Sequence, residues 1–385
     1  MPRLARVRRN TLALTVVASA LFTASAAPPV AASPRPADPL RNEVDAVHRT
    51  GVVGVSAEVA SRDGWHIARA GTSAKGSNSP MPRNGRFRVG SVTKTFTATV
   101  ILQLVGEGRI ALDDTVEHWL PGAVHGNGND GRLITVRQLL QHTSGVPDAL
   151  PDIPALTDPA GYRAQRFRTY TPPELVALAM RRPPTFPPGE GWAYSNTNYV
   201  LAAMIIERVT GRPWDHEVAE RIIRPLGMHG TSIPGTSASV SGPHARSYST
   251  FGDATGPTID VTTLNTTMAT GSGSIISTTH DLSRFYSALL NGRLMASAQF
   301  DDMTTTVPAP ALGVRYGLGI GSIPLSCGGA YFGHPGELLG YRTWIGITPD
   351  GSRTAVVYAT SEGGKDTQAA MSTLVDRELC RAPDM

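Results

Sequence analysis

The sequence predicts an α+β protein in which both ends of the chain form one antiparallel sheet, flanked by helices, with a mostly helical lobe inserted between them. Near the start, VGVSAEVAS and WHIARAGTS flank the turn signal Arg62-Asp63-Gly64, which is typical of a β-hairpin. Near the end, GYRTWIGIT and SRTAVVYATS flank Pro349-Asp350-Gly351 in the same way. Because helical patterns dominate the segment between them, we expect the two hairpins to share one sheet.

Helices are predicted wherever apolar residues recur at a spacing of three to four. Leu40, Val44 and Val47 predict a short amphipathic helix over residues 39–49, and KDTQAAMSTLVDREL predicts another at the C-terminal end. Between them, proline and glycine separate the helical stretches VRQLLQH, PPELVALAMRR, NTNYVLAAMIIERVTG, HEVAERIIRPLGM and HDLSRFYSALLNG.

These patterns predict one domain over residues 39–385. Its sheet lobe comprises about residues 39–90 and 310–385, and its helical lobe comprises about residues 91–309. A functional site is expected in the cleft between the two lobes.

The N-terminal residues resemble a secretory signal. Residues 1–26 contain a basic start, MPRLARVRR, then the apolar run TLALTVVASALFT and a cleavage pattern at Ala24-Ser25-Ala26. The alternative, a membrane anchor, is disfavoured because the run is short for a bilayer. We expect a bacterial protein secreted without a stable membrane anchor, with residues 27–38 as a disordered connector.

Charge argues against nucleic acid as a partner. The whole chain has a formal charge of +4, and the four arginines of residues 1–26 account for all of it. The remaining chain is neutral and has no basic tract.

The two cysteines, Cys327 and Cys380, are expected to form a disulfide in an oxidising compartment. The alternative is two unrelated small buried residues. Neither cysteine has neighbouring histidines or cysteines in the sequence, so no metal site is expected.

One lysine is conspicuous because this chain uses arginine for most of its positive charge. Of 35 basic side chains only Lys75, Lys94 and Lys365 are lysines. Lys94 follows Ser91 by three positions at the start of an apolar helical pattern, so the two side chains share a helix face. A buried lysine can lose its proton, as arginine cannot, and a neutral amine can activate a serine hydroxyl. Taken alone, the pair is more typical of a capping serine and a surface lysine, because serine is common.

Two further stretches carry groups that suit catalysis. GWAYSNTNYV contains Tyr194 and Asn196, and YFGHPGELLGY contains His334 on an expected strand. A tyrosine near cationic groups would have a lowered pKa and could relay protons, and an asparagine could hold a substrate amide. Each residue alone is more typical of a structural role, as a core tyrosine, a turn asparagine or a buried histidine.

Together and in this order, the three stretches resemble those of the penicillin-recognising serine enzymes, the group of D-alanyl-D-alanine carboxypeptidases and class C β-lactamases. The resemblance covers about residues 40–380 and also includes VGSVTKTF, ITVRQLLQHTSG and RPLGM. It is greatest to secreted bacterial DD-peptidases with Tyr-Ser-Asn and a His-x-Gly third element. It implies the corresponding fold, with the active site between the lobes.

The resemblance implies a role for each matching residue. Ser91 would be the acylated nucleophile, Lys94 would accept its proton, and Tyr194 would be the second acid/base group. Asn196 would orient the substrate amide, and His334, followed by Gly336, would supply a positive charge on the strand. The backbone N–H groups of Ser91 and Glu337 would form the oxyanion hole.

One residue departs from the family pattern. The third element is normally His-Thr-Gly or Lys-Thr-Gly, and its hydroxyl binds the free carboxylate of D-alanine or penicillin. Pro335 has neither a hydroxyl nor an N–H, and the neighbouring Glu337 is an acid. Strict carboxypeptidase specificity is therefore in doubt.

The leading interpretation is a serine D-alanyl-D-alanine carboxypeptidase, or a transpeptidase, that acts on peptidoglycan-type peptides. The alternative is an esterase or a D-amino-acid amidase or peptidase of the same family, which Pro335 favours. A β-lactamase is disfavoured, because no feature indicates fast deacylation. A binding protein that merely retained the fold is also disfavoured, because Ser91, Lys94, Tyr194 and Asn196 are all present.

Other classes of enzyme lack their motifs. There is no Gly-x-Ser-x-Gly elbow of an α/β-hydrolase, no HExxH and no P-loop. We therefore expect a monomer that binds a small peptide or β-lactam substrate and needs neither a cofactor nor a metal.

Overall fold

The computed structural model describes residues 1–2, 38–62, 64–253 and 256–381. The chain divides into two compact units, Met1–Ala37 and Asp38–Met385, and all the described helices and strands belong to the second. The predicted signal and connector lie outside the described residues, apart from residues 1, 2 and 38. Among the described helices, none combines the length and the apolar character that a membrane span requires.

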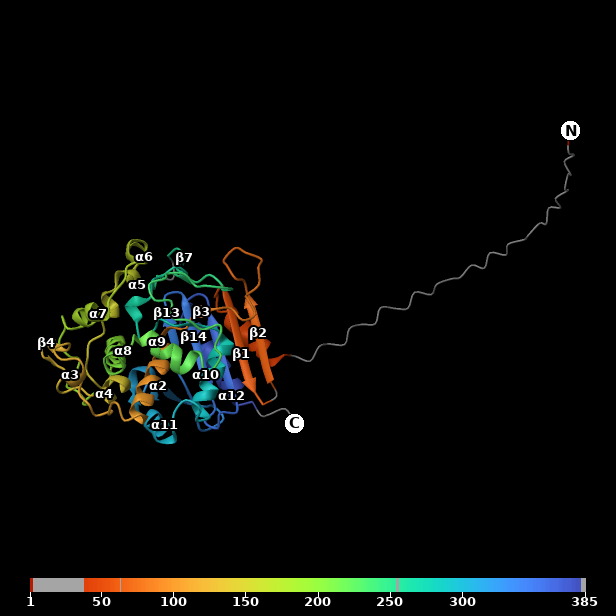
Figure 1. Cartoon of the computed structure of the whole chain (residues 1–385). Helices are drawn as coiled ribbons and strands as arrows, with labels where there is room; N and C mark the ends of the chain where they lie inside the picture. Colours follow the sequence, from red (N-terminus) through yellow and green to blue (C-terminus); the bar gives the residue numbers. More distant parts are fainter. Residues whose placement is uncertain (3–37, 63, 254–255, 382–385) are drawn as a thin grey trace. The chain divides into compact units, whose positions relative to one another are not determined.

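The largest element is a nine-stranded antiparallel sheet, which confirms the predicted fold class (Figure 1). Strand β1 pairs with β15, joining the hairpins from the two ends of the chain, with Val55 opposite Ala359 and Ala57 opposite Val357. The strand order is β2 (Gly64–Gly71), β1 (Gly54–Ser61), β15 (Thr354–Ala359), β14 (Tyr341–Ile347), β12 (Ala330–Gly333), β11 (Gly321–Pro324), β10 (Val314–Tyr316) and β9 (Val307–Ala309), with β13 (Gly336–Leu338) also paired to β14.

Helices cover both faces of this sheet. Successive residues of a strand point to opposite faces, so apolar residues at both sets of positions contact helices. Ala355 and Val357 of β15 belong to one apolar core with α1 (Pro39–His48) and α12 (Lys365–Leu379), whereas Val356 and Tyr358 belong to the other core. On that second side α10 (Thr279–Leu290) contacts β1 and β15. Although α10 lies within the segment predicted for the helical lobe, its apolar face therefore packs on the sheet.

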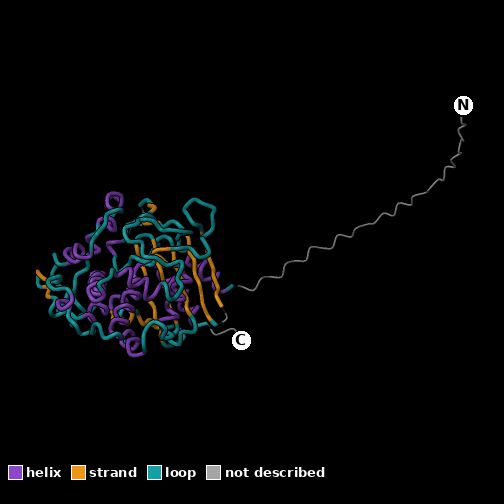
Figure 2. The backbone as a smooth tube through the Cα atoms, in the orientation of Figure 1, coloured by secondary structure: helices purple, strands orange, loops and turns teal. Residues whose placement is uncertain are grey.

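Most of the other helices gather away from the sheet (Figure 2). At their centre lies α2 (Thr93–Gly106), which is buried on nearly every side, as expected for a helix without a distinct polar face. It contacts α8 (Asn196–Thr210), α9 (Trp214–Val218) and α11 (Ser297–Thr304).

The remaining described helices are α3 (Val116–Trp119), α4 (Val136–Gln141), α5 (Pro154–Thr157), α6 (Pro159–Gln165) and α7 (Pro172–Ala179). The short strand pairs are β3 (Phe87–Arg88) with β8 (Ile276–Ser277), β4 (His125–Gly126) with β5 (Asn129–Asp130), and β6 (Tyr248–Ser249) with β7 (Ile259–Asp260).

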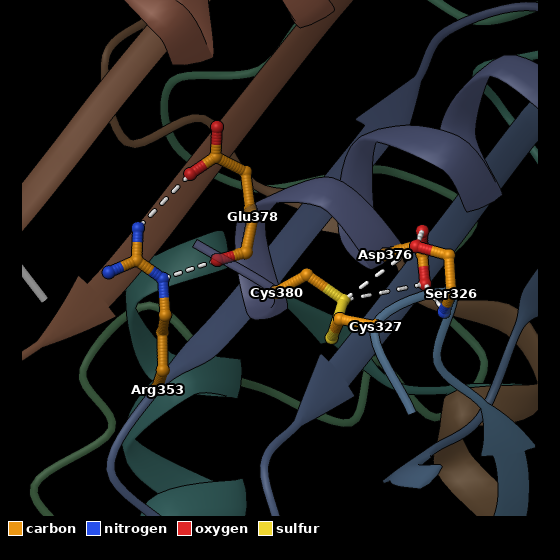
Figure 3. Close-up of a disulfide and its surroundings, with 6 residues drawn as sticks. All are labelled: Ser326, Cys327, Arg353, Asp376, Glu378 and Cys380. Atoms are coloured by element: carbon orange, nitrogen blue, oxygen red, sulfur yellow. Dashed lines mark hydrogen bonds and ion pairs between the residues drawn. A yellow bond between two sulfur atoms is a disulfide. The ribbon is translucent and has the colours of Figure 1, made fainter. Parts of the chain in front are cut away.

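The predicted disulfide between Cys327 and Cys380 is confirmed (Figure 3). It ties the connection between β11 and β12 to the C-terminal end of α12. Beside it, the backbone N–H and the hydroxyl of Ser326 both donate to the carboxylate of Asp376. These two hydrogen bonds join the β11–β12 connection to α12 at the same place as the disulfide.

Candidate active site

The nucleophile candidate lies where the chain turns from the sheet region into the central helix. After β3, residues Gly90–Val92 form a 3-10 turn (η1) that leads directly into α2. Ser91 is in this turn and Lys94 is in the first turn of α2, where the lysine side chain is fully buried. The Lys94 Nζ lies 3.1 Å from the Ser91 Oγ.

The surroundings of Lys94 suit a neutral amine, which has two N–H donors and one lone pair. Its Nζ lies 2.7 Å from Asn196 Oδ1 and 2.9 Å from the carbonyl oxygen of Ser272, both acceptors. The third partner, the Ser91 hydroxyl, can donate to the lone pair. Burial lowers the pKa of Lys94 to about 7, and the charge of Asp148 opposes this shift. A substantial share of Lys94 is therefore deprotonated at neutral pH.

Tyr194 lies just before α8, and its hydroxyl interacts with Ser91. The Lys94 Nζ lies over the tyrosine ring, 4.7 Å from its centroid. The expected lowering of the Tyr194 pKa is wrong: burial raises it, and the negative charge of Asp148 adds to the effect. The cations invoked in the prediction do not offset this burial. Tyr194 is therefore protonated at neutral pH.

Asn196 is the first residue of α8, and hydrogen bonds fix both ends of its side-chain amide. Its Oδ1 accepts from Lys94, and its Nδ2 donates to Asp148 Oδ2 at 2.9 Å. Its backbone N–H donates to the other carboxylate oxygen of Asp148 at 3.2 Å. No sequence pattern marks Asp148, because an aspartate after Gly-Val-Pro is an ordinary turn residue.

His334 lies between β12 and β13 and is buried. Its Nε2 is 2.8 Å from the Tyr316 hydroxyl, and its Nδ1 is 2.5 Å from the Pro335 carbonyl oxygen. The carbonyl can only accept, so Nδ1 carries the proton and Nε2 accepts from Tyr316. The predicted positive charge on His334 is wrong, since burial and the neighbouring Lys94 lower its pKa to about 3.

A second buried histidine supports the tyrosine. His142 has a left-handed backbone (φ 63°), and its ring lies 4.4 Å from that of Tyr194, centroid to centroid. Its Nδ1 accepts from the backbone N–H of Ser195 at 3.2 Å. His142 thus packs against Tyr194 and anchors Ser195, the residue that follows it.

The two predicted oxyanion donors come from segments in close contact. Gly90 has a φ of +56°, and a Cβ built on it would lie only 2.6 Å from the backbone N of Glu337. Only glycine allows η1 to approach β13 so closely. The backbone of Glu337 therefore lies beside the turn that carries Ser91.

These residues open onto one cavity of about 300 Å³, whose lining includes Ser91, Tyr194, His334, Gly336 and Glu337. Lys94 and Asn196 are not part of this lining, and hydrogen bonds connect Ser91 to Lys94 and Lys94 to Asn196. The predicted catalytic residues, brought from three distant parts of the sequence, thus meet in one place.

Charges in the cavity lining are balanced. Glu337 lies 3.5 Å from Arg342, between Oε1 and Nη2, and His334 is neutral at physiological pH. Among the described residues that line the cavity, no cation lacks an acidic partner. A substrate carboxylate would therefore meet Glu337 as well as Arg342.

A family profile described as Beta-lactamase matches residues 40–378. The chain belongs to the beta-lactamase family. This group includes the penicillin-recognising serine enzymes that the motifs resembled, and the resemblance is confirmed.

Relatives and solved structures of this family differ in their described activities. A penicillin-binding protein of Bacillus subtilis is 28% identical over 320 residues, which cover 79% of this chain and 67% of that protein. A D-stereospecific amidohydrolase from Streptomyces is 41% identical with a TM-score of 0.82, covering 89% of this chain and 98% of that one. A D-amino acid amidase from Ochrobactrum anthropi is 28% identical with a TM-score of 0.77, covering 88% of this chain and 96% of that one. Matches to three penicillin-binding proteins, two from Bacillus subtilis and one from Amycolatopsis lactamdurans, span 40% to 67% of the lengths of those proteins.

Proposed function

We propose that this protein is a secreted serine amidohydrolase that cleaves D-aminoacyl amides and esters whose leaving group has no free carboxylate. The observation that carries the proposal is the charge balance beside Pro335. That residue offers no hydroxyl, Glu337 adds a negative charge, and Arg342 is already paired. The D configuration is taken from the similarity to the Streptomyces and Ochrobactrum enzymes. Secretion is taken from the N-terminal sequence pattern.

Acylation follows from the arrangement of Ser91, Lys94 and Tyr194. Neutral Lys94 takes the hydroxyl proton while the Ser91 Oγ attacks the substrate carbonyl. The backbone N–H groups of Ser91 and Glu337 stabilise the resulting oxyanion. The proton then passes through Lys94 and Tyr194 to the leaving nitrogen or oxygen, and the carbon–leaving group bond breaks. Both relay groups return to their starting states.

Deacylation uses the same groups in reverse. Water attacks the ester on Ser91 and transfers a proton to the pair formed by Lys94 and Tyr194. That proton returns to the Ser91 Oγ as the acyl–oxygen bond breaks. The products are the free acid and the original enzyme.

A D-alanyl-D-alanine carboxypeptidase is the second candidate, and a specific observation favours it. Arg342 lines the cavity and could bind a substrate carboxylate if its contact with Glu337 were released. Similarity to penicillin-binding proteins also supports this activity.

The two functions are separated by a pair of substrates that differ only in terminal charge, D-Ala-D-Ala and D-Ala-D-Ala amide. Our proposal expects a kcat/KM at least about tenfold higher for the amide, with Ser91→Ala inactive on both. Pro335→Thr adds a hydroxyl and should raise activity on the free acid by about tenfold, the value of one hydrogen bond to a charged group. Faster cleavage of the free acid by the wild-type enzyme would instead support the carboxypeptidase.

A further inference from the structure

A second cavity, with a strongly charged lining, is separate from the catalytic one. Its volume is about 760 Å³, and the two cavities have no lining residue in common among the described residues. Its walls come from α6 with the residue after it and from the segment around β6 and β7, which lie together in Figure 1. The Tyr162 hydroxyl, which donates to the Thr263 carbonyl oxygen at 2.8 Å, joins these two walls. The residues of the lining that carry the argument are Arg163, Arg166, Arg246, Asp260 and Thr262.

Positive charge exceeds negative charge in this lining. The only acid among its described residues is Asp260, whose Oδ2 already lies 3.0 Å from Arg246 Nη1. The other carboxylate oxygen of Asp260 accepts from the backbone N–H and from the hydroxyl of Thr262. No described carboxylate forms an ion pair with Arg163 or Arg166. Two guanidinium groups therefore face the cavity without a counter-ion.

The guanidinium of Arg166 is held in position without an acid. Its Nη1 donates to the backbone carbonyl oxygen of Arg163 at 2.9 Å. Its Cζ lies 5.5 Å from the ring centroid of Tyr162 and 4.6 Å from that of Phe167. Because these contacts restrict a long side chain before any ligand arrives, binding costs less conformational entropy. Most N–H donors of Arg166 remain available for an oxyanion.

A buried arginine adds positive charge behind the wall of the cavity. Arg88 of β3 is 1% exposed, and its Nη2 donates to the carbonyl oxygens of Ala238 at 2.7 Å and Thr262 at 3.3 Å. Within the described part of the chain, its Nε and Nη1 have no hydrogen-bond partner and no carboxylate pairs with it. Arg88 is not part of the lining, so it acts on a ligand through its charge and not by contact. An anion in the cavity would offset part of the cost of burying this charge.

We propose that this cavity is a second ligand site, which binds a small, multiply charged oxyanion carrying phosphate or carboxylate groups. Arginine suits both groups, because its planar guanidinium donates two parallel N–H bonds to two oxygens of one anion. The unpaired charges of Arg163 and Arg166, with that of Arg88 behind them, favour a ligand with more than one negative charge. The site is independent of the proposed function, since its described residues take no part in the catalytic cavity.

Isothermal titration calorimetry with pyrophosphate and with citrate tests the site, at an ionic strength held constant with sodium chloride. We expect saturable binding at one site per chain. Binding of pyrophosphate alone would identify a phosphate site, binding of citrate alone would identify a polycarboxylate site, and binding of both would show that the shared charge is recognised. Arg163→Gln and Arg166→Gln should each weaken binding by about tenfold, the value of a hydrogen bond to a charged group. Asp260→Asn should tighten binding by about fivefold, the effect of removing a like charge about 4 Å away in water.

Arg168→Gln is the matched control. Arg168 carries the same charge in the same segment, but its guanidinium lies 4.4 Å from the Tyr170 ring centroid and it is not part of the lining. Its replacement should change the affinity by less than about twofold, because salt screens a charge that does not touch the ligand. Circular dichroism would confirm that each variant is folded.

Three results would overturn the proposal. One is the absence of saturable binding with both probes. Another is an equal loss of affinity in Arg168→Gln and Arg163→Gln, which would indicate diffuse attraction by surface charge. The third is a loss in Arg342→Gln without a loss in Arg163→Gln, which would place the anion in the catalytic cavity. None of these results bears on the proposed amidohydrolase activity, which depends on the other cavity.

Discussion

Lys94 illustrates that a candidate base needs both a suitable residue type and a buried position. Inside α2 its amine contacts two acceptors and one hydroxyl, and its pKa falls to about 7 because burial disfavours the ammonium form. An arginine in this position would keep its charge and could not accept the proton of Ser91.

The pH dependence of catalysis should report this amine. Because only neutral Lys94 can accept the proton, kcat/KM should rise with pH through about 7 and fall tenfold per unit below it. The raised pKa of Tyr194 keeps its ionisation above this range. Steady-state kinetics between pH 5 and 9 would check the profile. A kcat/KM that still rises tenfold per pH unit between pH 8 and 9 would contradict the assignment of the base.

Asp148 should affect the pH at which kcat/KM rises. Its charge raises the pKa of Lys94, so Asp148→Asn should move the ascending limb of kcat/KM to lower pH. The lost carboxylate also weakens the anchoring of Asn196, so kcat should fall. Asp113→Asn, at a residue whose side chain is 85% exposed, is the control and should leave the profile in place. If kcat/KM of Asp148→Asn rose at the same pH as that of the wild-type enzyme, the carboxylate would not act on the lysine.

At the scale of elements, the site depends on the contact between η1 and β13. The backbone of Glu337 occupies the space that a side chain at position 90 would need. The two segments could not approach so closely with any residue other than glycine there. The turn and the strand therefore place the two predicted oxyanion donors in neighbouring segments.

Gly90→Ala should separate these donors. The added methyl would lie 2.6 Å from the Glu337 N at a φ of +56°, so β13 must shift. Loss of one oxyanion donor lowers kcat by about 100- to 1000-fold. Kinetics and circular dichroism would check this together, and Gly108→Ala, which has an equally positive φ but open space around it, controls for backbone strain. Full activity in Gly90→Ala would contradict the predicted oxyanion hole.

Several elements were predictable from local patterns, and others were not. The two hairpins and the terminal helices follow from alternation and helical spacing, which act within one element. The packing of α10 on the sheet depends on which apolar face is left uncovered, and that is decided by the whole chain. Likewise, motifs located His334 and Tyr194, but their protonation depends on burial. Asp148 carried no pattern at all.

At the scale of the whole molecule, the sheet unites the ends of the chain. The disulfide between Cys327 and Cys380 adds a covalent link between residues 53 positions apart. On the chain-entropy account, such a link stabilises the folded state by about 4 kcal/mol. Arg353 adds an ion pair to Glu378 of the same helix end, at 3.2 Å (Figure 3).

Replacing both cysteines should therefore affect stability more than catalysis. In Cys327→Ser with Cys380→Ser, we expect the free energy of unfolding to fall by up to about 4 kcal/mol. Gln368, near the start of α12, lines the cavity that contains Ser91, whereas the disulfide lies at the other end of this helix. We therefore expect kcat/KM to be unchanged in conditions where the variant is folded. Denaturant titration and kinetics would check the two parts. A large loss of kcat/KM in the folded variant would contradict this separation of roles.

The most direct test of the account is to measure the ionisation of Lys94 itself. The chain contains only three lysines, so a protein labelled with ¹³C at the lysine Cε gives three signals, and Lys94→Met identifies the one of interest. We predict that the Lys94 signal titrates with a pKa of about 7. Titration of that signal near 10.4, the ordinary value for lysine, would show that Lys94 remains charged at neutral pH and would contradict its role as the base for Ser91.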